Sequence, residues 1–211
     1  MPDLQESTSA TALPRETESD EELMVRFRDH DDLEAFETLV HRYEKPLYNY
    51  LYRYLRNAEL AEEAFQNAFA RVHEKRELYT PDRKFRPWLY SIATNQAVDE
   101  LRREGRHQAT SLDQKRTEGE SGTVSLMDLL ESTSPSPYEE LEAEERRNWT
   151  RQAIDNLPEH LRVVVLLIYF QGLKYREAAD ILEIPVGTVK SRLNAALAML
   201  NAAWRGEHAS G

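Results

Sequence analysis

The chain has no cysteine, which excludes disulfide bonds and zinc sites built on thiolates. Glycine is scarce, with 7 among 211 residues, and there is no glycine-rich phosphate loop. No apolar run reaches the roughly 18 residues of a membrane-spanning helix, since the longest covers only residues 163–170. The first residues are acidic and rich in serine and threonine, unlike a signal peptide. We therefore expect a cytoplasmic protein with no membrane insertion.

Signatures of an enzyme are missing as well. The six histidines show no metal-ligand spacing, and no serine lies in a nucleophile elbow. The many glutamates of the expected helices are most simply interpreted as solvated faces. The sequence thus predicts a non-catalytic protein that needs no cofactor and no metal ion.

The net charge of −11 is unevenly distributed. Residues 83–107 carry six basic and three acidic side chains, and residues 186–205 carry three basic and no acidic ones. Between them, residues 108–148 hold ten acidic and four basic side chains. Because neutralisation of phosphates supplies much of DNA affinity, a chain this acidic should bind DNA weakly by itself. The two basic segments therefore favour DNA contacts made inside a larger complex.

Apolar residues recur at helical spacing, and no segment alternates as a strand does. We expect an all-α fold of two small helical domains joined by a flexible acidic linker, the second a helix-turn-helix domain. The domains would span residues 20–105 and 138–205, with the linker at residues 106–137. Residues 1–19 would form a disordered tail and residues 206–211 a short one.

Four helices are expected in the first domain. They start at residues that can cap a helix or occupy its first turn, namely Asp20, Asp32, Asn57 and Pro87 or Trp88. Pro46 is expected to kink or restart the second helix, and Gly105 to end the fourth. In the second domain, residues 138–156 predict one helix. Pro158 would lie in the first turn of the next, which carries residues 163–170 and ends at Gly172.

Residues 175–193 carry the most informative pattern. They predict two short helices joined by a tight turn, the second starting just after Pro185. The pair would pack through Ala178, Ala179, Leu182, Ile184, Val189 and Leu193. The outer side of the second helix carries Thr188, Lys190, Ser191, Arg192 and Asn194. This is the pattern of a helix-turn-helix whose second helix enters the major groove of DNA.

Several segments match one family together. Residues 157–162 (LPEHLR), 169–175 (YFQGLKY) and 184–193 (IPVGTVKSRL) are similar to its last domain. Residues 61–72 (AEEAFQNAFARV) and 85–95 (FRPWLYSIATN) are similar to its first domain. The chain thereby resembles bacterial sigma factors of the sigma-70 family, in the extracytoplasmic-function branch. A lone helix-turn-helix would be weakly specific, whereas two distinct domains in this order are strongly specific.

The resemblance implies a promoter-recognition subunit of RNA polymerase that directs transcription initiation from a specific set of bacterial promoters. Its partners would be promoter DNA and the clamp helices and flap of core RNA polymerase. The helix at residues 61–73 would contact the clamp helices through Glu62, Glu63, Gln66, Asn67 and Arg71. From the residues alone, the same face could also be an ordinary solvated helix surface.

The resemblance also implies that the helix at residues 85–103 recognises and opens the minus-ten promoter element. Opening needs basic side chains for phosphates and a pocket for a flipped base, which the loop at residues 77–85 would line. Asn95 is the candidate base contact. The candidate backbone contacts are Arg83, Lys84, Arg86, Arg102, Arg103 and Arg106. Trp88 is in register with Ile92, which favours core packing over base stacking.

For the minus-thirty-five element, the resemblance implies base contacts from Lys190 and Ser191 and phosphate contacts from Arg192 and Thr188. Lys190 and Arg192 could instead both contact only phosphate. Asn194 and, on the preceding helix, Arg176 and Lys174 complete the candidate DNA surface.

Two positions depart from the family pattern. Glu183 stands where the turn usually has glycine, so a left-handed backbone there would cost about 1 kcal/mol. Asn194 is followed by two alanines, which makes this part of the helix less basic and less bulky than in many relatives. That composition indicates weak autonomous affinity for DNA.

Members of this family are usually held inactive by a cognate anti-sigma factor, so we expect one here, and no homo-oligomer is required. The acidic linker could mimic nucleic acid in a polymerase channel or serve only solubility. Two other functions stay open. The chain could be a stand-alone helix-turn-helix regulator that binds palindromic half-sites as a homodimer. It could also be a sigma mimic that sequesters an anti-sigma factor.

Overall fold

The computed structural model describes residues 18–110, 146 and 148–208. Its described regular elements are all helical, which confirms the all-α fold. The tail at residues 1–17 and residues 111–145, which include most of the expected linker, lie outside the described part. Side chains are described up to Glu104 in the first stretch and up to Arg205 in the second.

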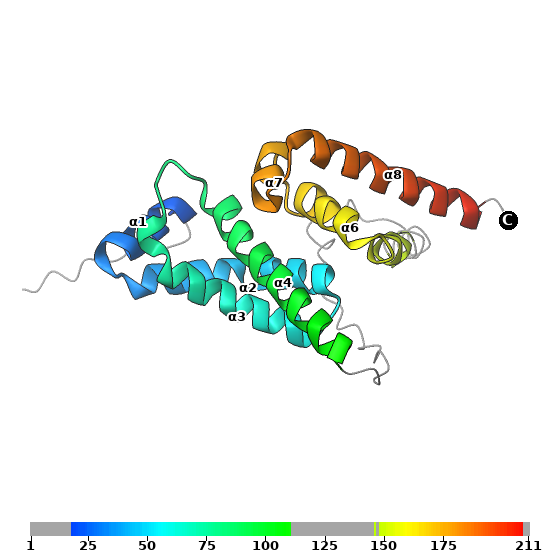
Figure 1. The fold of residues 1–211 in the computed structure, drawn as a ribbon. Helices are drawn as coiled ribbons and strands as arrows, with labels where there is room; N and C mark the ends of the chain where they lie inside the picture. The colour runs from blue at the N-terminus through cyan, green and yellow to red at the C-terminus, as the bar shows by residue number, and fades with distance from the viewer. Residues whose placement is uncertain (1–17, 111–145, 147, 209–211) are drawn as a thin grey trace, which may run out of the picture.

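The first domain consists of helices α1 (Asp20–His30), α2 (Leu33–Leu55), α3 (Ala58–Glu74) and α4 (Phe85–Thr110), with a 3-10 turn η2 (Arg76–Leu78) before α4 (Figure 1). Helices α1, α2 and α3 begin where expected, because in each case a polar side chain accepts hydrogen bonds from free backbone N–H groups of the first turn. These caps are Ser19, Asp32 and Asn57.

Three expectations for this domain were wrong. Helix α2 does not restart at Pro46 but runs through it, because buried Tyr43 and Leu47 hold the helix in the core on both sides of the proline. Helix α4 begins earlier than expected, at Phe85, whose N–H donates to Glu21 Oε1 at 3.1 Å. It also continues past Gly105, since one helical glycine costs only about 1 kcal/mol.

Aromatic rings fill the core where the loop before α4 meets the helices. Trp88 is 9% exposed, and its ring centroid lies 5.1 Å from that of Tyr79 and 6.0 Å from that of Phe85. Tyr43 packs edge-on against Phe85 at 5.5 Å. Trp88 therefore packs in the core, as its register with Ile92 predicted. This packing fixes the start of α4 and, with it, the candidate pocket described below.

The second domain contains a helix over residues 148–155, α6 (Glu159–Val165), a π-helical turn η3 (Leu166–Phe170), α7 (Tyr175–Leu182) and α8 (Val186–His208). Helix α8 begins directly after Pro185, which confirms the predicted helix-turn-helix. Pro158 precedes α6 instead of lying in its first turn, because its ψ of 140° is extended. Trp149 and Trp204 meet edge to face at 4.7 Å and join α8 to the helix at residues 148–155.

The two domains touch each other. Helix α4 contacts α7, and the end of α2 contacts α6 and η3 (Figure 1). The helix-turn-helix is thus held beside the first half of α4, although about sixty residues separate α4 and α7 along the chain.

The turn between α7 and α8 contains a strained residue. Glu183 has φ 52° and ψ 41°, the left-handed conformation that glycine adopts most easily. We predict that Glu183→Gly raises the free energy of unfolding by about 1 kcal/mol in urea denaturation. The matched change Glu62→Gly, in the right-handed interior of α3, should lower it by about 0.5–1 kcal/mol. A loss of stability from both changes would contradict this account of the turn.

Candidate nucleic-acid interface

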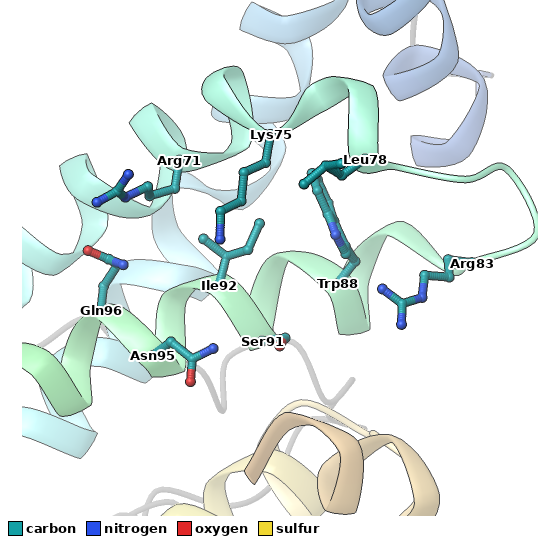
Figure 2. Close-up of a pocket in the computed structure, with 9 residues that line it drawn as sticks. All are labelled: Arg71, Lys75, Leu78, Arg83, Trp88, Ser91, Ile92, Asn95 and Gln96. Carbon is teal, nitrogen blue, oxygen red and sulfur yellow. The ribbon is translucent and has the colours of Figure 1, made fainter. Parts of the chain in front are cut away.

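A basic pocket lies between the end of α3 and the first half of α4. Its volume is about 240 Å³. Figure 2 shows that Arg71 comes from α3 and Lys75 from the residue directly after it, and that Arg83 comes from the loop. The other lining residues are Leu78, Trp88, Ser91, Ile92, Asn95 and Gln96. We call these nine residues the basic pocket.

The chemistry of the basic pocket suits a nucleotide. Arg71, Lys75 and Arg83 are exposed cations that can pair with phosphate oxygens. Asn95 is exposed on α4, and its amide can both donate to and accept from a base edge. Trp88 and Ile92 give the pocket an apolar wall. Such a combination of cations, one amide and an apolar surface can hold an unpaired base with its phosphate.

The other minus-ten candidates lie apart from this pocket. Lys84 Nζ is 3.7 Å from Glu21 Oε1, and Arg102 pairs with Asp99 at 3.5 Å. Arg86 donates to Gln171 Oε1 of the second domain at 3.0 Å. The side chain of Arg106 lies outside the described part.

On α3, the candidate polymerase-binding residues do not form one uniform surface. Glu62, Glu63 and Gln66 are exposed, and Gln66 donates to Glu62 at 2.8 Å. Asn67 is half-buried and bonds to Glu100 of α4. Arg71 pairs with Glu74 at 2.7 Å and lines the basic pocket. The structure therefore places Arg71 with the candidate DNA contacts.

A carboxylate cluster joins the far ends of α3 and α4. Arg103 Nη1 donates to Glu63 at 2.8 Å and to Glu100 at 2.9 Å. Glu100 is 2% exposed, and burial raises its pKa, with the negative charge of Glu63 acting in the same direction and Arg103 opposing it. The cluster occupies Arg103, so this arginine holds two helices together in the present arrangement.

Most of the candidate DNA contacts on the helix-turn-helix are exposed to solvent. Exposed side chains are Lys174, Arg176, Lys190, Ser191 and Asn194, whereas Thr188 and Arg192 are half-buried. Ser191 donates to the Thr188 carbonyl at 3.0 Å. Lys190 Nζ lies 5.9 Å from the centre of the Tyr175 ring, which restrains the ammonium at the domain surface.

Sequence reasoning missed Lys75, Ser91 and Gln96 in the basic pocket. A signal was present, because Lys75 follows Arg71 by four residues at the end of one helix. Ser91 and Asn95 share the same spacing on another helix. What the sequence could not supply is that these two faces meet, since that depends on how α3 packs on α4.

Two sequence families match the chain, Sigma-70 region 2 over residues 39–107 and Sigma-70, region 4 over residues 147–200. The ECF RNA polymerase sigma factor SigW of Bacillus subtilis is 33% identical over 163 residues, which cover 77% of this chain and 85% of SigW. The ECF sigma-E factor of Escherichia coli K12 is 33% identical over 175 residues, which cover 82% and 88%. The chain belongs to the extracytoplasmic-function sigma factors.

Solved structures agree with this sigma-factor fold. CnrH, in complex with the cytosolic domain of CnrY, aligns with a TM-score of 0.60 at 21% identity over 90% of this chain and 99% of CnrH. The sigma factor RpoE of Bartonella quintana, in complex with the anti-sigma factor NepR, aligns with a TM-score of 0.60 at 20% identity, covering 81% and 96%. Identities this low support the fold alone.

As a sigma factor, the protein is a promoter-recognition subunit that binds core RNA polymerase and directs transcription initiation. Within residues 18–110, 146 and 148–208, no three side chains of metal-binding type lie close enough to hold an ion. In the same part of the chain, no helix is long and apolar enough to cross a membrane.

The raised pKa of Glu100 gives stability a pH dependence with a definite sign. Ionised Glu100 is disfavoured in the folded state, so the protonated form stabilises the fold relative to the unfolded chain. This contribution to the free energy of unfolding is fully present below the ordinary pKa of 4.5 and is lost as the pH rises through the raised value. We predict that Glu100→Gln becomes more stable relative to the wild type as the pH rises above 4.5. Thermal unfolding at several pH values measures this difference.

The control for this prediction is Glu62→Gln on the exposed face of α3, which should follow the wild-type pH profile. A relative stability of Glu100→Gln that falls with increasing pH would show that the pairing with Arg103 outweighs the burial of the carboxylate.

Proposed function

We propose that this sigma factor divides promoter recognition between its two domains, and that the basic pocket holds an unpaired base of the minus-ten element. The observation that supports this most is the convergence of Arg71, Lys75 and Arg83 beside exposed Asn95. Three cations can neutralise the phosphates of a bent strand, while Asn95 reads one base edge. Lys84, Arg86 and Arg102 would then add phosphate contacts along the strand as it leaves the pocket.

The contact with core polymerase is assigned to the exposed face of α3, with Glu62, Glu63 and Gln66 at its centre. This face is polar and lies away from the buried alanines of the same helix, as a detachable binding surface requires. We propose that Arg71, which lines the basic pocket, contacts DNA instead of core polymerase. The proposed domain limits stay those predicted, residues 20–105 and 138–205.

In the second domain, α8 would enter the major groove at the minus-thirty-five element. Lys190 and Ser191 would contact base edges, while Thr188, Arg192, Arg176 and Lys174 would contact phosphates, with Asn194 at the end of the surface. The exposure of Lys190 beside the Tyr175 ring supports its role as the leading contact.

We further infer that the protein acts without catalysis of its own, in the cytoplasm where core polymerase transcribes. A cognate anti-sigma factor is a further proposed partner. Structures of related sigma factors contain such partners, including NepR bound to RpoE of Bartonella quintana. The partner of the present protein would have to cover the α3 face or the DNA surfaces in order to inhibit.

The first test is gel filtration of the full chain with sigma-free core RNA polymerase. The proposal expects co-elution at one-to-one stoichiometry, followed by specific transcripts in a run-off screen. Elution as a separate dimer that binds duplex DNA tightly would favour the stand-alone regulator. Co-elution without any promoter opening would favour the mimic that only binds partners.

Two substitutions on α3 separate polymerase binding from DNA opening. We predict that Arg71→Gln leaves co-elution with core polymerase intact and reduces open-complex formation roughly tenfold, the effect of losing one charge-assisted contact. Glu62→Ala should instead weaken co-elution. Open complexes are measured by permanganate reactivity of unpaired thymines. Equal loss of co-elution in both variants would show that Arg71 contacts core polymerase, as the sequence first predicted.

Substitution of Lys190 tests whether this residue contributes to specificity for the minus-thirty-five sequence. We predict that Lys190→Ala loses about 1–3 kcal/mol of binding at the preferred minus-thirty-five sequence and much less at a scrambled one. The control Lys174→Ala removes a proposed phosphate contact, so it should weaken both sequences equally. If Lys190→Ala also weakens both equally in a titration of holoenzyme with DNA, then Lys190 contacts only phosphate.

A further inference from the structure

Gln171 lies at the centre of the contact between the two domains. Its side chain is buried, and its Oε1 accepts hydrogen bonds from the Tyr90 hydroxyl at 2.5 Å and from Arg86 Nη2 at 3.0 Å. Burial raises the pKa of Tyr90 to about 12, so its hydroxyl stays a donor at neutral pH. Gln171 directly precedes Gly172, whose φ of +64° turns the chain toward the helix-turn-helix.

A second contact joins the end of α2 to α6 and η3. Arg162 Nη2 donates to the Tyr54 carbonyl at 3.1 Å, while its Nη1 donates to the Asp155 carbonyl at 2.9 Å. The Tyr54 hydroxyl donates to Glu159 at 3.2 Å. The guanidinium of Arg53 lies 4.7 Å from the centre of the Phe170 ring. The interface therefore includes several polar and charged contacts: hydrogen bonds of Gln171, Arg162 and Tyr54, and the stacking of Arg53 on Phe170.

This arrangement is incompatible with reading a promoter. The minus-ten and minus-thirty-five elements lie about 25 base pairs apart, which corresponds to about 85 Å at about 3.4 Å per base pair. Here α4 is in direct contact with α7, so the two DNA-reading units cannot reach both elements together. The domains must separate before both elements are bound.

The closed arrangement also engages a side chain that the DNA would use. Arg86, a candidate phosphate contact, is bound to Gln171. The Tyr90 hydroxyl, on the same helix as the candidate base contact Asn95, is bound to the same Gln171. Closure and DNA binding thus compete for Arg86.

We propose that Gln171, with Tyr90 and Arg86, forms an intramolecular latch that holds this sigma factor closed and unable to engage both promoter elements. Opening moves the hydrogen-bonding groups of the latch into water, where they are solvated, so the free-energy difference between closed and open states is small. A partner that binds the separated domains, such as core polymerase with promoter DNA, then shifts the equilibrium toward the open form.

Single-molecule energy transfer between the two domains tests the latch directly. The chain has no cysteine, so Glu44→Cys on α2 and Asn201→Cys on α8, both at exposed positions, give a unique dye pair. In the full chain carrying Gln171→Leu, we expect the ratio of open to closed molecules to rise at least about fivefold, as when a buried hydrogen bond is lost. Tyr90→Phe should shift the ratio in the same direction.

The matched control is Gln152→Leu, the same chemical change at an exposed position of the helix over residues 148–155. Helix content and cooperative thermal unfolding identify variants that fold. If Gln171→Leu and Tyr90→Phe fold and show no more open molecules than Gln152→Leu, the latch is overturned. Open molecules that increase only in the two latch variants support it.

The consequence for transcription rests on the proposed function, whereas the energy-transfer measurement does not. With limiting core polymerase, Gln171→Leu is expected to give several-fold more run-off transcript than Gln152→Leu. An open Gln171→Leu variant without sigma activity would refute the proposed function and leave the latch standing. An active wild type whose open fraction is unchanged by Gln171→Leu would refute the latch alone.

Discussion

The close packing of α3 on α4 is the contact on which the rest of this structure depends. Both helices carry small buried side chains, which permit close packing: Ala61, Ala64 and Ala68 on α3, and Ala93 and Ala97 on α4, are all fully buried. Without bulky side chains between them, the two helices come close enough for Arg71 and Lys75 to stand opposite Asn95. The basic pocket thus depends on the packing of α3 on α4 and not only on the residues that line it.

Helix α4 contacts several parts of the molecule at once, and this is the basis of the proposed equilibrium between a closed and an open arrangement. One side is buried in the core, one lines the basic pocket, and its first turns meet Gln171 of the other domain. Arg86 at the start of α4 contacts the second domain and is also a proposed DNA contact, so under this proposal occupancy by one partner excludes the other. The proposed latch follows from this sharing of a single helix.

The charge distribution fits a protein that works only within a larger complex. Several basic residues near the proposed DNA surface already have acidic neighbours, as Lys84 has Glu21 and Arg103 has Glu63. A net charge of −11 opposes binding to a polyanion at long range. Core polymerase would therefore have to supply much of the affinity for DNA, while this chain supplies the choice of sequence.

The sequence by itself determined the helical fold, the helix-turn-helix after Tyr175 and the family, because periodicity, caps and motifs are local. It also indicated Asn95 and the left-handed Glu183, each from its place in a motif. It misjudged Pro46 as a point where the helix could restart and Gly105 as the end of a helix, since packing by Tyr43 and Leu47 and the small cost of one glycine override these local signals. Only the tertiary structure decided that Arg71 and Lys75 face Asn95, and that Gln171 meets Tyr90. Both pairings join residues distant along the chain, and helix packing alone sets which of them meet.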